Sequence, residues 1–194
     1  VGDPPPKTER VSSIAIVSAG SVKTIRDGVL YSPTGGDNIL PLAIADQERY
    51  VAMQAAFGDI YMTDGLAYRK YAMAYDPADD AVTTWTATAG SLPVAATILA
   101  LYNGRLVLSG AASDPHNWFM TRKDAPTDFD YSPVTTDKTM AIAGNNSDAG
   151  MIGDVITALA PYSDDLMIIG GDHSLWIMRG DPAAGGAVSY THLT

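Results

Sequence analysis

Three histidines are the first side chains to consider for metal binding or proton transfer. His116, His173 and His192 lie far apart in the sequence. His116 and His173 fall in equivalent loops of a repeated pattern that is described below. They could share a metal ion, but the favoured interpretation is two solvated loop residues. The chain has no cysteine, which excludes disulfides, thiolate chemistry and cysteine-bound zinc.

Oxygen-bearing side chains gather in three places. Residues 144–150 (GNNSDAG) could surround calcium, but they lack the closing Glu and the Asp/Asn spacing of an EF-hand, so a turn-rich loop is favoured. Adjacent carboxylates occur at Asp79-Asp80 and at Asp164-Asp165. Neighbouring side chains on a strand or turn point apart, so we expect both pairs to form turns and not an acid–base dyad.

Aromatic residues could form a platform for carbohydrate. Most of them fall inside predicted strands, which favours packing between stacked sheets. The candidates are Tyr68, Tyr71, Trp85, Trp118, Phe119 and Trp176.

The known catalytic motifs do not occur. The sequence has no serine nucleophile elbow, no phosphate-binding loop, no zinc-protease helix motif and no dinucleotide-binding glycine motif. Residues 171–176 come nearest to the sialidase-type Asp box and do not match it. We therefore expect no catalytic residue, no bound metal and no cofactor, and a protein that is not an enzyme.

Composition narrows the class of protein further. The 194 residues are 46% hydrophobic and 18% charged, a globular balance, and the net charge is −10. An acidic surface repels phosphate, which argues against general nucleic-acid binding. The longest nearly apolar run, residues 92–102, is too short to cross a bilayer, so no membrane insertion is expected. Residues 1–10 contain three consecutive prolines and no apolar segment, so no signal peptide is visible.

Short strands are the expected secondary structure. The 12 prolines and 18 glycines are spread along the chain and interrupt any long helical pattern. Between them lie short apolar runs rich in Val, Ile, Tyr, Trp and Thr, which are typical of strands.

An internal repeat organises these strands. Three segments, 50–65, 96–110 and 155–170, each read as a strand, a tight turn and a second strand that ends at Gly. Asn103-Gly104 is a strong hairpin signal. Each copy continues with an aromatic strand and then a turn with Asp and Pro. The aromatic strands are 68–75, 118–122 and 175–179, and the spacing of the copies is counted from Asp59 to Arg105 and from Arg105 to Asp165.

Four strands in roughly 40–50 residues are the size of one β-propeller blade. The fourth strands are expected at 82–86 and 129–132, with an insertion over 135–153. We predict two antiparallel sheets, over about 50–94 and 96–133, stacked face to face, and strands of a preceding blade within 12–31. The alternative is a β-sandwich with chance similarity between its hairpins.

The fold class is therefore all-β, a partial propeller of about three four-stranded blades from a longer, truncated protein. Residues 1–10 are expected to be extended or disordered, 11–182 to form the incomplete propeller, and 183–194 to be a non-native or disordered tail. The last residues resemble translated sequencing-adapter sequence. The third copy stops after Asp181-Pro182, so strand 175–179 should be an unpaired edge unless residues from the N-terminus close it. The chain is expected to be aggregation-prone or marginally stable.

Residues 102–110, 115–122, 124–131, 156–162 and 166–182 together resemble propeller-like virion proteins of tailed bacteriophages. That group includes tail or baseplate hub components and packaged-DNA stabilisation proteins. The resemblance covers about residues 12–182. Its motifs are structural: a GRL hairpin, a W-x-M-x-R strand and an Asp-Pro-Thr-Asp-like turn.

The resemblance implies a non-enzymatic virion structural protein of the tail or head–tail junction. It would be assembled in the host cytoplasm and would bind other virion proteins, and self-association into a homo-oligomer is a further expectation. Two alternatives stay open. One is an extracellular carbohydrate-binding or carbohydrate-active propeller, and the other is a generic scaffold propeller.

Overall fold

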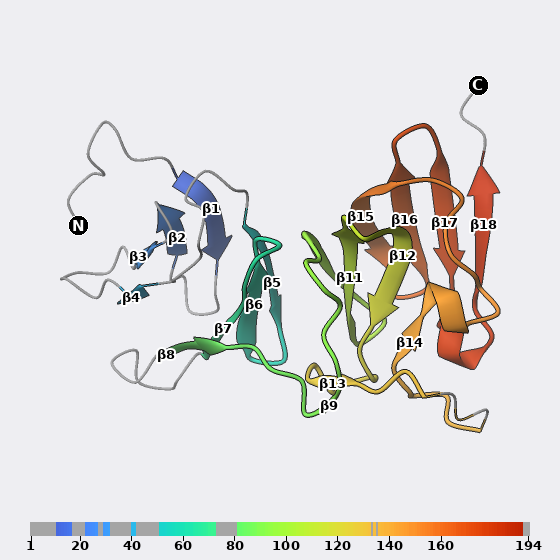
Figure 1. Ribbon diagram of the computed structural model, residues 1–194, viewed down its shortest axis with the longest axis horizontal. Coiled ribbons are helices and arrows are strands. Elements are labelled where there is room, and N and C mark those ends of the chain that lie inside the picture. Colours follow the sequence, from blue (N-terminus) through green and yellow to red (C-terminus); the bar gives the residue numbers. More distant parts are fainter. Residues whose placement is uncertain are drawn as a thin grey trace. The chain divides into compact units, whose positions relative to one another are not determined.

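The computed structural model describes strands along most of the chain (Figure 1). Its described backbone covers residues 11–16, 22–26, 29–31, 40–41, 51–72, 81–132, 134 and 136–191, and its described side chains cover 51–72, 83–132, 134 and 136–187. The chain divides into two compact units, Val1–Trp85 and Thr86–Thr194, which are treated separately below. No helix of the described part is both long enough and apolar enough to span a bilayer.

The first unit begins with a sheet that fulfils the expectation of strands within 12–31. Its four antiparallel strands follow one another in chain order. They are β1 (Val11–Ile16), β2 (Val22–Arg26), β3 (Val29–Tyr31) and β4 (Leu40–Pro41). The described chain therefore holds four such sheets, where the repeat predicted about three.

The second sheet follows the predicted strand order. It consists of β5 (Ala52–Ala56), β6 (Asp59–Thr63), β7 (Tyr68–Ala72) and β8 (Ala81–Thr84). Phe57 and Gly58 both have positive φ, 52° and 81°, as a two-residue hairpin requires. Trp85 packs edge-on against Tyr61, with ring centroids 4.8 Å apart. The four main strands of the segment 50–94 thus form a sheet of their own, separate from the four-stranded sheet that holds residues 98–120.

The third sheet opens the second unit. Its strands are β10 (Ile98–Tyr102), β11 (Arg105–Ala111), β12 (Asp114–Met120) and β14 (Ile142–Ala143). The predicted Asn103-Gly104 turn is confirmed, since the two residues have φ of 50° and 69°.

The fourth strand of this sheet comes from a different place than predicted. Residues 129–132 do not pair with β12; β14, inside the expected insertion, does. The short strand β13 (Asp128–Phe129) instead pairs in parallel with β9 (Ala89–Gly90). The side chain of Asp128 accepts the N–H of Asp130, and that of Asp130 accepts the N–H of Ser132. These consecutive turns bend the chain away from an extended strand.

The fourth sheet corrects the prediction of an unpaired edge. Its strands are β15 (Ile156–Ser163), β16 (Leu166–Gly171), β17 (Leu175–Arg179) and β18 (Ala187–Thr191). β18 pairs along the whole of β17, so 187–191 form a strand and not a disordered tail. A short 3₁₀ helix, η4 (Pro182–Ala184), leads into β18. The Asp181 side chain accepts the N–H of Ala183 at 3.0 Å and caps this helix.

The third and fourth sheets differ in alignment by one residue from the sequence prediction. The turn between β15 and β16 is Asp164-Asp165, so Arg105 corresponds to Leu166 and not to Asp165. By the cross-strand pairs, Trp118 corresponds to Leu175, the first residue of the predicted strand 175–179. A shift of one residue moves a side chain to the opposite face of its sheet. Trp118 and Trp176 therefore point to opposite faces of their own sheets.

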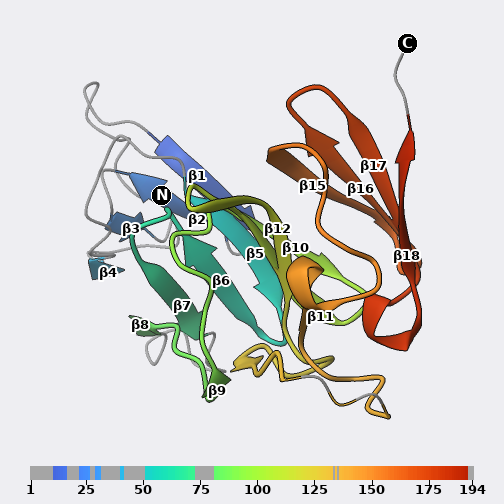
Figure 2. The ribbon, with the colours of Figure 1, turned by 45° about the vertical axis from the view of Figure 1, so that its right-hand side comes forward.

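The third and fourth sheets stack and share one core (Figure 2). Val107, Trp118 and Met120 on the third sheet face Met167 and Ile169 on the fourth, and all five are fully buried. Burying large side chains of this kind stabilises the stack by roughly 1.5–3 kcal/mol each.

A buried arginine joins the two sheets at one end of this core. The Arg105 side chain is fully buried, and its Nε and Nη2 each lie 3.0 Å from Oδ2 of Asp181. Its Nη1 donates to the carbonyl oxygens of Thr121 and Met140, at 2.8 and 2.6 Å. Beside it, the hydroxyl of Tyr102 donates to the carbonyl oxygen of Gly180. We call this arrangement the Arg105 anchor.

Candidate functional site

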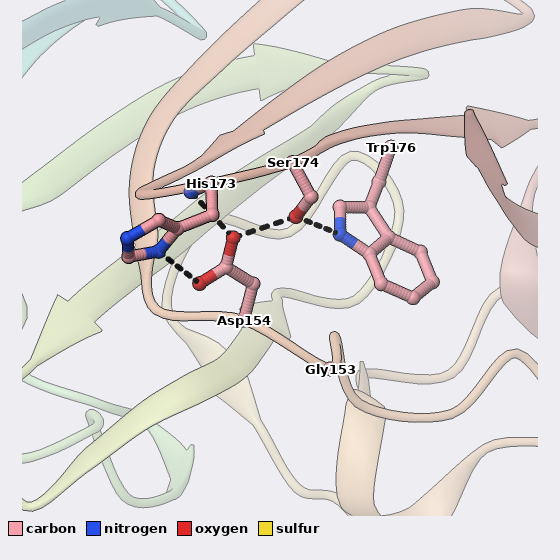
Figure 3. Close-up of a pocket in the computed structure, with 5 residues that line it drawn as sticks. All are labelled: Gly153, Asp154, His173, Ser174 and Trp176. Atoms are coloured by element: carbon pink, nitrogen blue, oxygen red, sulfur yellow. Dashed lines mark hydrogen bonds and ion pairs between the residues drawn. The ribbon is translucent and has the colours of Figure 1, made fainter. Parts of the chain in front are cut away.

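A surface hollow of about 440 Å³ lies at one end of the fourth sheet (Figure 3). It is formed by residues just before β15, by the 172–174 loop between β16 and β17, and by the second residue of β17. Its lining residues are Gly153, Asp154, His173, Ser174 and Trp176.

The Asp154 carboxylate holds the 172–174 loop in place. Its Oδ2 accepts the backbone N–H of His173 at 2.8 Å and the hydroxyl of Ser174 at 2.6 Å. Its Oδ1 accepts the N–H of Val155 at 2.8 Å. Three donors to one carboxylate favour its charged form.

The hydroxyl of Ser174 has a second partner on its other side. It accepts the indole N–H of Trp176 at 2.7 Å, so Trp176, Ser174 and Asp154 form one chain of hydrogen bonds (Figure 3). Gly171 leaves room for this chain, because a Cβ there would lie 2.9 Å from the Ser174 hydroxyl and closer still to the Asp154 carboxylate.

These hydrogen bonds lower the pKa of Asp154 from 3.8 to about 2. The largest cause is the hydrogen bond from the Ser174 side chain, followed by the one from the His173 backbone. Nδ1 of His173 is 3.9 Å from Oδ1 of Asp154, and the His173 side chain is 89% exposed. Figure 3 shows the imidazole on the opposite side of the carboxylate from Ser174.

The order of these groups does not match a nucleophilic triad. Such a site places a histidine between the hydroxyl and the carboxylate, so that the imidazole can take the hydroxyl proton. Here Asp154 lies between Ser174 and His173, and the Ser174 proton is donated to the carboxylate. A carboxylate with a pKa of about 2 is also a weak base at neutral pH. The hydrogen bonds of Asp154 therefore fix the conformation of the 172–174 loop.

The two histidines are placed differently from the prediction. His173 is in the predicted kind of loop, but His116 lies within β12 and not in a loop. Both are exposed. Across the described residues, no group of three or more His, Asp or Glu side chains is placed to hold a metal ion.

The 144–150 segment forms a loop tied to neighbouring strands. Its first residues form a short 3₁₀ helix, η3 (Gly144–Asn146). The Asn146 side chain accepts the N–H of Ala143 and donates to the carbonyl of Tyr131. The indole N–H of Trp118 donates to the carbonyl of Gly150 at 3.0 Å. The amide groups of this loop thus make turn contacts, as the sequence favoured.

The remaining candidates divide between turn and core. Asp164-Asp165 is the β15–β16 turn, as predicted, and Asp79-Asp80 lies outside the described residues. Tyr71, Trp85 and Trp118 are fully buried. Tyr68, Phe119 and Trp176 are half-buried, and of the six predicted aromatics Trp176 lines the hollow.

Asp154, Ser174 and Arg105 had no site role in the sequence interpretation. Asp154 precedes an apolar strand and Ser174 follows a Gly-Gly pair, and neither context is distinctive. The position of Arg105 could have indicated a buried ion pair, because this arginine begins the apolar strand 105–108 directly after an Asn-Gly turn. A charged residue at that place needs a buried partner.

Comparison with known proteins identifies the fold. No protein-family model and no curated protein matches the chain. Among solved structures, a catalytically inactive virginiamycin B lyase from Staphylococcus aureus, crystallised with quinupristin, superposes with a TM-score of 0.57 at 10% identity. The superposition covers 95% of this chain and 56% of the lyase chain. Hsv2 from Kluyveromyces lactis has a TM-score of 0.49 at 9% identity, over 92% of this chain and 49% of its own.

The chain folds as part of a β-propeller. Its four-stranded antiparallel sheets in chain order are the blades of that fold. The chain spans just over half the length of the lyase. At 10% identity the likeness concerns the fold alone.

Proposed function

We propose that this chain is a non-enzymatic structural protein that acts by binding other proteins through its propeller blades. The observation that carries the proposal is the bonding of Ser174 in the hollow. Its hydroxyl donates to Asp154 and accepts from Trp176, so it holds the loop and is not activated for attack. The Arg105 guanidinium likewise donates its hydrogen bonds to Asp181 and to backbone carbonyls, so it has a structural role.

A covalent probe tests the non-enzymatic part. A fluorophosphonate reacts with serines that a neighbouring base activates, and we expect mass spectrometry to find no adduct on Ser174. Stoichiometric labelling of Ser174 that is lost in His173→Ala would overturn the proposal, because it would make His173 the base.

Metal content tests the same conclusion independently. We expect elemental analysis of the purified protein to find no stoichiometric metal ion. An ion that disappears in His116→Ala and in His173→Ala would contradict it.

At a finer level, we propose that the protein is a component of a tailed-phage virion. The support is the resemblance carried by the GRL hairpin and the following strands, residues 102–131, and by residues 156–182. The arginine of that hairpin is Arg105, whose buried ion pair with Asp181 explains why the hairpin carries an arginine at this position.

Virion composition tests this placement. Immunogold labelling of tailed particles from a host that produces the protein should mark the tail or the head–tail junction. Particles that carry no label, with the protein found only in the particle-free lysate, would overturn the virion placement.

A further inference from the structure

The hollow beside Asp154 holds a negative charge that no lysine or arginine neutralises. None of its lining residues is Lys or Arg, and among the described residues none of those two types pairs with Asp154. The Asp154 side chain is 15% exposed, so a ligand in the hollow can reach its carboxylate. With a pKa of about 2, this carboxylate stays ionised at neutral pH. A charge of this kind attracts a cation.

One acceptor position of this carboxylate remains open. An ionised carboxylate has about four lone-pair positions. Oδ2 accepts two donors, the backbone N–H of His173 and the hydroxyl of Ser174. Oδ1 accepts one, the N–H of Val155. The open position is therefore on Oδ1, the oxygen that lies toward the exposed imidazole of His173 (Figure 3).

The gap between Oδ1 and this imidazole fits a donor that bridges the two. Nδ1 of His173 lies 3.9 Å from Oδ1 of Asp154, which is too long for a hydrogen bond between them. A nitrogen placed between these atoms can lie about 2.9 Å from each of them. An ammonium group has three donors, so it can bond to the carboxylate and to a neutral imidazole at once.

The indole of Trp176 gives the hollow an apolar wall. Its N–H is already bonded to Ser174, so the rest of the ring offers carbon atoms to a ligand. Gly153 has no side chain to cover the ring, where a Cβ would lie 3.4 Å from Cζ2 and 3.6 Å from Cη2 of the indole. An alkyl chain can pack on such a wall, and a cation near an aromatic ring is attracted to it.

These features favour lysine over arginine and over carbohydrate. Arginine binds a carboxylate best through two parallel hydrogen bonds, one to each oxygen, but Oδ2 of Asp154 is already occupied. A sugar needs several polar groups directed at its hydroxyls, whereas the Ser174 hydroxyl and the Trp176 N–H already have partners. Lysine presents a single compact charge at the end of a four-carbon stem.

We propose that the hollow binds a lysine side chain of a partner protein, with its ammonium between Asp154 and His173 and its stem against Trp176. This inference rests on the protein-binding function proposed above and names the chemistry that the partner presents at this site. One exposed contact of this kind is weak, so we expect a single blocked lysine to bind in roughly the millimolar range.

Nuclear magnetic resonance of the whole chain labelled with ¹⁵N tests the proposal. Nα-acetyl-lysine methylamide should shift the indole N–H resonance of Trp176 saturably, and n-butylammonium, which has the same stem and charge, should do so similarly. The arginine analogue should bind at least about threefold more weakly, and the analogue acetylated at Nε should not bind. Trp85 and Trp118 are fully buried, so their indole resonances should stay in place and serve as internal controls.

Three variants locate the binding in the hollow. Asp154→Asn removes the charge and should weaken binding by at least about tenfold. Gly153→Ala leaves the hydrogen bonds of Asp154 in place, but its methyl group covers the indole edge and should weaken binding by at least about threefold. Asp172→Asn is the matched control, because it removes the same charge from an exposed position of the same loop and should change binding less than about twofold.

Several results would overturn the lysine site. One is the absence of a saturable shift of Trp176 with the blocked lysine, and another is equal weakening by Asp172→Asn and Asp154→Asn. Binding of n-butylammonium without binding of the blocked lysine would show a site for free amines and not for a protein side chain. A methyl glycoside that shifts Trp176 when the blocked lysine does not would show a carbohydrate site. The fluorophosphonate and virion experiments do not depend on this site, so its failure is distinguishable from failure of the proposed function.

Discussion

At the scale of single residues, the Arg105 anchor is the contact with the largest expected effect on stability. Arg105 is fully buried, and Asp181 is 9% exposed. Replacing Arg105 by Ala leaves the Asp181 carboxylate and several carbonyls without their donor. We expect Arg105→Ala to lower the free energy of unfolding by about 3–5 kcal/mol in urea denaturation.

Arg122 supplies the control for this prediction. It makes ion pairs with Asp128 and Asp137, at 2.8 and 2.6 Å, but its side chain is 33% exposed. Solvent screens such pairs, so Arg122→Ala should cost no more than about 1 kcal/mol. Equal losses from the two substitutions would show that burial does not set the contribution of Arg105.

The lowered pKa of Asp154 predicts that the stability of the fold depends on pH. Its pKa falls from 3.8 to about 2 on folding, so its hydrogen bonds to Ser174 and His173 contribute fully above pH 3.8. That contribution is lost as the pH falls from about 4 through 2, because the carboxyl then takes up its proton. In urea denaturation at several acidic pH values, Asp154→Asn should lose less stability over this interval than the unmodified protein. If the free energy of unfolding of the two proteins falls equally with pH, the hydrogen bonds of Asp154 do not stabilise the fold.

At the scale of secondary-structure elements, the β9–β13 pair depends on Gly90. Gly90 has φ of 65°, and a Cβ there would collide with the backbone of Phe129 on the paired strand. Gly150 has a similar φ of 77° but has nothing within 4 Å of the corresponding position. Gly150→Ala should therefore cost only the backbone strain, about 1–2 kcal/mol. Gly90→Ala should cost about 1–3 kcal/mol more, because the strands must also move apart.

Thermal unfolding of the two variants measures this difference. If Gly90→Ala and Gly150→Ala lower the melting temperature equally, then the close approach of Gly90 to the Phe129 backbone adds nothing to the loss of stability.

At the scale of the whole molecule, the chain divides into two compact units. The second unit has its own core and the Arg105 anchor. We expect residues 86–194 to fold without the first unit and to unfold in a single cooperative transition. Circular dichroism and near-ultraviolet spectra of that fragment test the expectation, and a fragment without fixed tertiary structure would contradict it.

Much of the architecture could be read from the sequence, because it rests on local signals. Asn103-Gly104 is a turn that few other residue pairs can adopt, and the structure contains it. The recurring strand–turn–strand pattern predicted separate four-stranded sheets, and this too is confirmed. The partial propeller followed from the spacing of these copies, since one blade cannot bury both of its faces alone.

The rest depended on which strands meet in space. β14 replaced residues 129–132, and β18 completed the last sheet, because pairing partners far along the chain leave no local mark. The one-residue difference between the predicted match of Arg105 with Asp165 and the observed match with Leu166 was visible only in the pairing register. Arg105 meets Asp181, and Asp154 meets Ser174, across long stretches of sequence. The sequence by itself determined the strands and turns, and the tertiary structure decided which polar side chains became partners, because burial leaves each charge only the partner that packing brings to it.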